Sequence, residues 1–126
     1  MSASSASWVF LASTVLSVSA ASVPKLTGTY SSLQMGTEDL HGVEISIVIG
    51  GKGYFAIVQC AEGVPGIPQV VPAQIAGLSL QFTLENSATG CPASAFQGTV
   101  SANGLTGAFE GTTWPGFMRR RKGYWQ

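Results

Sequence analysis

The sequence predicts an all-β fold, an eight-stranded up-and-down antiparallel β-barrel that follows an N-terminal signal peptide. Apolar and polar residues alternate in short runs from residue 26 onward, without the spacing of an amphipathic helix. Turn-forming residues separate these runs, and the 126-residue chain contains 16 glycines. Only 10% of the residues are charged and the formal net charge is zero. This composition is typical of a small secreted β protein and argues against nucleic-acid binding, which favours a basic chain.

The first 20 residues differ in kind from the rest. Trp8 to Val18 is an apolar stretch diluted by Ser and Thr, and Val18-Ser19-Ala20 offers small residues suited to signal peptidase. A membrane-spanning helix needs ~20 apolar residues, so this stretch is too short. We predict a signal peptide over residues 1–20, a single domain over 21–126, and a secreted or periplasmic location without stable membrane insertion. An uncleaved anchor and a disordered tail are the alternatives.

A central hairpin organises the predicted barrel. Val43–Ile49 and Tyr54–Cys60 are β-branched runs with a period of two, and Gly50–Gly53 lies between them as a tight turn. In the second run Phe55 and Ile57 share one face, which we expect to point inward. Glycine suits such a turn because it adopts positive φ angles without strain.

Six further strands complete the barrel. Asn103-Gly104 predicts a type I′ hairpin, and the prolines within residues 61–69 argue against a central strand there. The predicted strands cover Leu26–Leu33 before the hairpin, and Val70–Ala76, Leu78–Glu85, Phe96–Val100, Leu105–Phe109 and Met118–Gln126 after it.

An up-and-down order places alternate connections at the same end of the barrel. The long connections at 35–42, 61–69, 86–94 and 111–117 should share one end, and the tight turns at 50–53, 77 and 102–104 the other. Cys60 and Cys91 both fall at the loop-rich end. Because exported proteins fold in oxidising compartments, we predict a Cys60–Cys91 disulfide.

The first predicted strand carries a family resemblance. Leu26-Thr27-Gly28-Thr29-Tyr30 resembles the G-x-W opening of the lipocalin and avidin group of small barrels, the calycins, with Tyr30 in place of Trp. The resemblance implies that a basic residue of the last strand, here Arg121 or Lys122, covers Tyr30 through a cation–π contact. It also implies a small-ligand carrier or an inhibitor scaffold. The tryptophans with which avidins enclose biotin are absent apart from Trp114.

No arrangement of reactive side chains predicts catalysis. Glu38, Asp39, His41 and Glu44 match no recognised metal-ligand spacing, so a solvated loop is expected and neither a metal nor a cofactor is predicted. A Cys–His nucleophile would need a free thiol, which the disulfide removes. The basic run Arg119–Lys122 either protects a strand from unwanted pairing or contacts an anion.

We therefore expect a non-enzymatic exported barrel that binds a small apolar or amphipathic ligand at its loop-rich end. One alternative is a structural or interaction module whose interior is filled by its own side chains. Another is a small outer-membrane barrel, although the predicted strands are shorter than the nine to eleven residues that a membrane requires. The sequence does not determine the oligomeric state. The predicted ligand-binding residues are Phe55, Ile57, Leu80, Phe82 and Phe109 in the interior and Trp114 at the rim.

Overall fold

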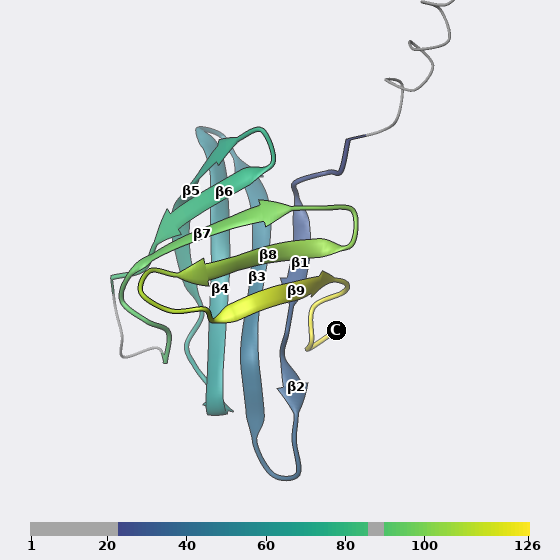
Figure 1. The fold of residues 1–126 in the computed structure, drawn as a ribbon, viewed down its shortest axis with the longest axis vertical. Coiled ribbons are helices and arrows are strands. Elements are labelled where there is room, and N and C mark those ends of the chain that lie inside the picture. The colour runs from purple at the N-terminus through teal and green to yellow at the C-terminus, as the bar shows by residue number, and fades with distance from the viewer. Residues whose placement is uncertain (1–22, 86–89) are drawn as a thin grey trace, which may run out of the picture.

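A computed structural model describes residues 23–85 and 90–126, so the predicted signal peptide at 1–20 lies outside the described residues. None of the described residues belongs to a helix with the length and hydrophobicity that crossing a bilayer requires. Within the described ranges, all the regular elements are antiparallel strands (Figure 1). They are β1 (Gly28–Ser31), β2 (Gln34–Met35), β3 (Leu40–Gly50), β4 (Gly53–Pro65), β5 (Gln69–Ala76), β6 (Ser79–Thr83), β7 (Ala95–Val100), β8 (Gly104–Phe109) and β9 (Pro115–Arg120).

Eight of these strands close into an up-and-down barrel, which confirms the predicted fold class. From β3 to β9 each strand pairs with the next, and β1 closes the sheet by pairing with both β9 and β3. Tyr30 lies at this junction, opposite Ile45 on one side and Arg120 on the other. The short strand β2 only extends the edge of β3. In Figure 1 the short strands β7, β8 and β9 cross in front of the long β3–β4 hairpin.

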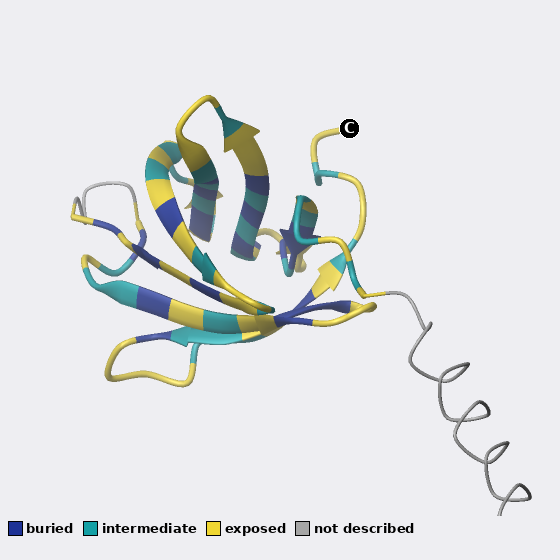
Figure 2. Ribbon diagram, turned by 90° about the horizontal axis from the view of Figure 1, so that it is seen from above, coloured by how far each residue is buried: buried dark blue, intermediate teal, exposed yellow. Residues whose placement is uncertain are grey.

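The interior is built from every second residue of the barrel strands. Figure 2 shows the result as alternating buried and exposed bands along the strands. Because side chains alternate between the faces of a strand, one register fixes which residues point inward. The buried hydrophobic residues of the main core are Tyr30, Val43, Ile45, Ile47, Ala56, Val58, Cys60, Ala73, Leu80, Phe82, Leu84, Cys91, Phe96, Val100, Leu105, Phe109 and Met118.

The predicted inward face of β4 was wrong. The turn at Gly50–Gly53 pairs Ile47 with Ala56 and Ile45 with Val58, so Ala56 and Val58 share the inner face with the β3 isoleucines. Phe55 and Ile57 therefore point outward and are half-buried. Their neighbours Ala56 and Val58 are fully buried.

The largest differences from the predicted strand boundaries are at β4 and β9. β4 continues through residues 61–65 and pairs with β3 as far as Gly63, whereas its pairing with β5 stops at Val58. Pro65 lies beyond the last β4–β5 pair, so the backbone N–H that proline lacks is not needed for pairing with β5. β9 begins at Pro115 and ends at Arg120, so Met118–Gln126 is not one strand. Beyond Arg120 the chain turns along the outer surface, where Tyr124 N donates a 2.6 Å hydrogen bond to Glu44 Oε2.

The predicted type I′ turn does not form. Neither Asn103 nor Gly104 has a positive φ angle. Instead, Ser101 N donates to Gly104 O at 2.8 Å, and Ser101 Oγ accepts from Gly104 N at 3.2 Å. Glycine is required at position 104 for another reason: a Cβ there would collide with the carbonyl oxygen of Met118. The close approach of β8 to β9 fixes this residue.

Candidate functional site

Among the described residues, the loop-rich end of the barrel is defined by the connecting residues 36–39, 66–68, 84–85, 90–94 and 110–114. A Cys60–Cys91 disulfide ties β4 to the segment before β7, with Cα atoms 5.3 Å apart. This confirms the predicted pairing. Both cysteines are buried, so the bond is part of the core. A disulfide is compatible with an oxidising extracellular or periplasmic compartment.

Aromatic rings fill the interior next to the disulfide. The Phe82 and Phe96 rings stack with centroids 4.8 Å apart, and the Phe109 ring packs edge-on against Phe96 at 5.4 Å. Each of these three side chains is at most 1% exposed. The half-buried Trp114 stacks on Phe109 with centroids 5.8 Å apart. Trp114 therefore covers the core at the rim.

The structure brings together only part of the predicted ligand-binding set. Leu80, Phe82 and Phe109 point inward and are buried in the core, and Trp114 packs against it. Phe55 and Ile57 lie on the outer face of β4, separated from the other four by the barrel wall. Ligand binding by these residues stays a prediction.

The opposite end, at the turns 51–52, 77–78 and 101–103, is closed by Tyr30 and Arg120. The Arg120 guanidinium carbon lies 4.8 Å from the centroid of the Tyr30 ring. Arg120 also donates hydrogen bonds to the carbonyl oxygens of Lys25 at 2.6 Å, Ser101 at 3.3 Å and Thr27 at 3.4 Å. These contacts join the start of β1 to the β7–β8 turn.

Sequence reasoning had assigned this cation–π contact to Arg121 or Lys122. The contact belongs to Arg120 because β9 pairs Arg120 directly with Tyr30. The Tyr30 hydroxyl donates a 2.6 Å hydrogen bond to the carbonyl oxygen of Leu26. Burial raises the pKa of the Tyr30 phenol above the ordinary tyrosine value, although the charge of Arg120 acts in the opposite direction.

The other three residues of the basic run, Arg119, Arg121 and Lys122, have different surroundings. Arg119 and Lys122 are exposed. Arg121 donates hydrogen bonds to Leu33 O at 2.7 Å and to Ser31 Oγ at 3.4 Å. Two of the four cations therefore bind main-chain carbonyls near β1, and not a carboxylate such as Glu44.

Of the titratable residues that the sequence singled out, Glu38 and Asp39 lie in the loop before β3, whereas His41 and Glu44 lie on β3, which begins at Leu40, inside the predicted loop at 35–42. His41 Nε2 lies 3.8 Å from Asp39 Oδ2, and both side chains are more than 60% exposed. In residues 23–85 and 90–126, no group of three or more His, Cys, Asp or Glu side chains is arranged to hold a metal ion. Asp39 and His41 are therefore exposed where the chain enters β3, and the connection itself covers only residues 36–39.

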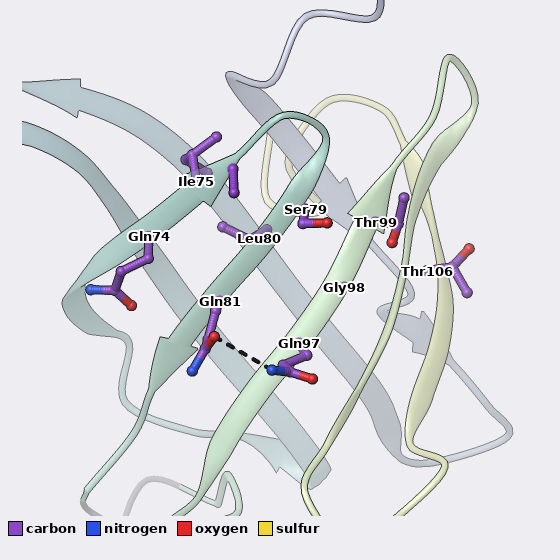
Figure 3. Close-up of a pocket in the computed structure, with 10 residues that line it drawn as sticks. Gln74, Ile75, Ser79, Leu80, Gln81, Gln97, Gly98, Thr99 and Thr106 are labelled. Carbon is purple, nitrogen blue, oxygen red and sulfur yellow. Dashed lines mark hydrogen bonds between the residues drawn. The ribbon is translucent and has the colours of Figure 1, made fainter.

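A hollow of about 390 Å³ lies on the outer face of β5–β8 (Figure 3). Sequence reasoning missed it because its polar lining residues were only the outward half of an alternating pattern, although Leu80, predicted to bind a ligand in the interior, also lines it. The available signal was uncharged amides and hydroxyls at alternate positions of consecutive strands. The hollow is lined by Gln74, Ile75, Ala76, Ser79, Leu80, Gln81, Gln97, Gly98, Thr99 and Thr106.

The chain was compared with protein-family models, with curated protein sequences and with solved structures, and no match was found. Function is therefore inferred from the arrangement of the chain's own residues.

Proposed function

We propose that this chain is an exported, non-enzymatic binding module whose interior is filled by its own side chains and whose partners bind on the outer surface. The observation that carries the proposal is the packing of the interior. All eight barrel strands contribute buried apolar residues to one core. An eight-stranded barrel encloses just enough room for its own side chains or for one small ligand. Here Tyr30 and the three phenylalanines occupy that space.

The ends of the barrel support the same proposal. Trp114 stacks on Phe109 at the loop-rich end, and Arg120 lies over Tyr30 at the other. An apolar ligand would have to displace one of these contacts to reach the interior. This favours the module with a filled core over the carrier of an enclosed apolar ligand.

The distribution of reactive and polar groups supports a soluble, non-catalytic role. Both cysteines are joined in the disulfide, and the side chains of Asp39, before β3, and His41, at the start of β3, are exposed. Apolar side chains point inward on every barrel strand, whereas Gln81, Gln97 and other polar residues point outward. A transmembrane barrel has the reverse arrangement, with an apolar band facing lipid.

A calycin-like origin is part of the proposal. The up-and-down order of eight strands and the arginine of β9 over the aromatic residue of β1 support it. These features concern the scaffold alone. They carry no inference about a ligand.

A titration with cis-parinaric acid, a fluorescent fatty acid, tests the filled interior. The mature, disulfide-bonded protein should give no saturable increase in fluorescence, because Tyr30 and the three phenylalanines occupy the interior. Native mass spectrometry of the purified protein should show the mass of the chain without a retained lipid. One saturable site per chain that competes with unlabelled fatty acid would overturn the proposal.

A further inference from the structure

We propose that the outer face of β5–β8 carries a binding site for a neutral carbohydrate. The inference rests on the proposed function, because it assigns a ligand class to the outer surface of a barrel with a filled core. The site is the hollow of about 390 Å³ described above, here called the polar groove. Its volume lies within the range of ~300–1,000 Å³ that is usual for small-molecule sites. The polar side chains that define it are Gln74, Ser79, Gln81, Gln97, Thr99 and Thr106.

Strand register arranges these side chains in two rows. Gln74, Gln81 and Gln97 form one row, because Gln81 lies opposite Gln74 on β5 and opposite Gln97 on β7. Ser79, Thr99 and Thr106 form a second row across β6, β7 and β8. Side chains directly opposite each other have Cβ atoms about 4.5–5.5 Å apart. The groove therefore presents a regular array of polar groups on a rigid sheet (Figure 3).

The chemistry of the array matches that of a sugar. Amides and hydroxyls each both donate and accept hydrogen bonds, as do the hydroxyl groups of a carbohydrate. All six side chains are exposed. Gln97 Nε2 and Gln81 Oε1 are 3.4 Å apart, a long hydrogen bond that a ligand can replace. Because the groups are held on paired strands, binding would order few side chains beyond the three glutamines.

An exposed aromatic ring lies next to the groove, in the neighbouring hollow that Phe117 lines with Asn103, Arg119 and Arg120. Phe117 on β9 is directly opposite Thr106, and its side chain is 48% exposed. The ring packs over Gly104, since a Cβ at that position would come within 2.9 Å of two of its carbon atoms. A pyranose ring has an apolar C–H face that can pack on the electron-rich face of an aromatic ring. Phe117 thus adds an apolar platform beside the two polar rows.

Other ligand classes fit this surface less well. Of the described residues that line the groove, none is charged, so a phosphate or carboxylate would find no counter-charge. A peptide that adds as a β-strand needs a free sheet edge. β6 and β7 are each paired on both sides and offer none.

The test is a titration of the mature, isotope-labelled protein with cellohexaose, maltohexaose and chitohexaose, followed by NMR. Backbone amides of residues 74–81 and 97–106 should shift saturably with at least one of the three sugars. Pull-down on cellulose, starch and chitin then distinguishes binding to a polymer from binding to the free oligosaccharide. The Cys60–Cys91 bond is kept intact throughout.

Variants separate the groove from the rest of the surface. Changing Gln81 and Gln97 together to Ala should weaken binding about tenfold or more, because two hydrogen-bonding side chains are lost. Phe117→Ala should weaken it by a similar factor. The matched control is Thr83→Ala, an exposed β6 residue outside the groove lining, which should leave affinity within about twofold. Thermal unfolding of each variant checks that the fold is kept.

Three outcomes would overturn the inference. The first is the absence of any saturable shift with the three oligosaccharides and of any retention on the three polymers. The second is binding that the Gln81 and Gln97 changes do not weaken. The third is preferential binding of heparin that Arg119→Ala abolishes, which would place the site in the neighbouring hollow formed by Asn103, Phe117, Arg119 and Arg120. None of these outcomes bears on the filled interior, which the fatty-acid titration tests separately.

Discussion

At the loop-rich end the interior is closed by stacked aromatic rings and a disulfide, whereas at the other end it is closed by a tyrosine and an arginine bound to main-chain carbonyls. The Phe82, Phe96, Phe109 and Trp114 rings stabilise the first end by removing apolar area from water. At the second end, Arg120 binds three carbonyl oxygens and covers Tyr30.

The two ends are closed by different kinds of contact. At the loop-rich end, stacked rings and a disulfide close the interior. Tight turns bring main-chain carbonyls together, and a guanidinium with five donors can bind several of them at once. The first end should therefore respond mainly to changes in side-chain volume and to reduction. The second should respond mainly to loss of hydrogen bonds and to pH.

The largest expected effect is that of Phe82→Ala. The side chain contacts both Phe96 and Phe109 and is fully buried, so its removal leaves a cavity in the core. We expect the free energy of unfolding to fall by about 3–5 kcal/mol, measured by urea denaturation. The matched control Phe117→Ala removes a half-exposed ring and should cost less than about 1 kcal/mol. A loss at Phe82 no larger than that control would show that the interior is not packed.

Loss of the disulfide should have the next largest effect. Cys60 and Cys91 are 31 residues apart in sequence, and closing a loop of this size stabilises by roughly 3–4 kcal/mol in the chain-entropy model. We expect the double change to Ala to lower the free energy of unfolding by this amount. Reduction of the wild-type protein should reproduce the effect. If reduction left the unfolding curve unchanged, the Cys60–Cys91 disulfide would not stabilise the fold as expected.

The fold was predictable because its two main determinants are local. Alternation between Leu78 and Glu85, or between Val43 and Ile49, shows which segments are strands. Glycine- and proline-rich connections show where the chain reverses direction. Strands that pair antiparallel in sequence order then form an up-and-down barrel. The same reasoning placed Cys60 and Cys91 at one end and predicted their disulfide.

The pairing register of the strands and the grouping of residues on the outer surface could not be predicted in the same way. Phe55 and Ile57 are larger than Ala56 and Val58, yet the smaller pair lies inside because the Gly50–Gly53 turn sets the pairing with β3. The cation–π partner was missed by one residue for a similar reason, since the end of β9 depends on its pairing with β1. The polar groove needs four strands in register, which no single segment specifies.

At the tight-turn end, Arg120→Met should cost about 1–3 kcal/mol of unfolding free energy. The change keeps much of the side-chain volume but removes three hydrogen bonds and the cation over Tyr30. Arg119→Met is the matched control, because Arg119 is the exposed neighbour on the same strand. Arg120→Lys should recover only part of the loss, since an ammonium lacks the planar fork. Equal effects at positions 119 and 120 would show that Arg120 does not close this end.

The smallest effect should be that of Tyr30→Phe, which removes one hydroxyl and its 2.6 Å hydrogen bond to Leu26 O. At neutral pH we expect a loss of about 0.5–1.5 kcal/mol. At alkaline pH the variant should differ from the wild type in a second way. Burial raises the pKa of the Tyr30 phenol in the folded state, so its contribution is fully present below the unfolded pKa of about 10 and is lost as the pH rises through the folded pKa. Between these two pKa values the unfolding free energy of the wild type should fall more steeply with rising pH than that of the variant.

Urea denaturation of both proteins across the alkaline range measures this difference. Tyr54 and Tyr124 are present in both proteins, so the difference between the two curves isolates Tyr30. A near-ultraviolet titration of tyrosinate should also show one phenol of the wild-type protein ionising late, and Tyr30→Phe should remove that step. Parallel stability curves would mean that the phenol is no harder to ionise in the folded protein. The stability contributed by the tight-turn end would then be as independent of pH as that of the aromatic end.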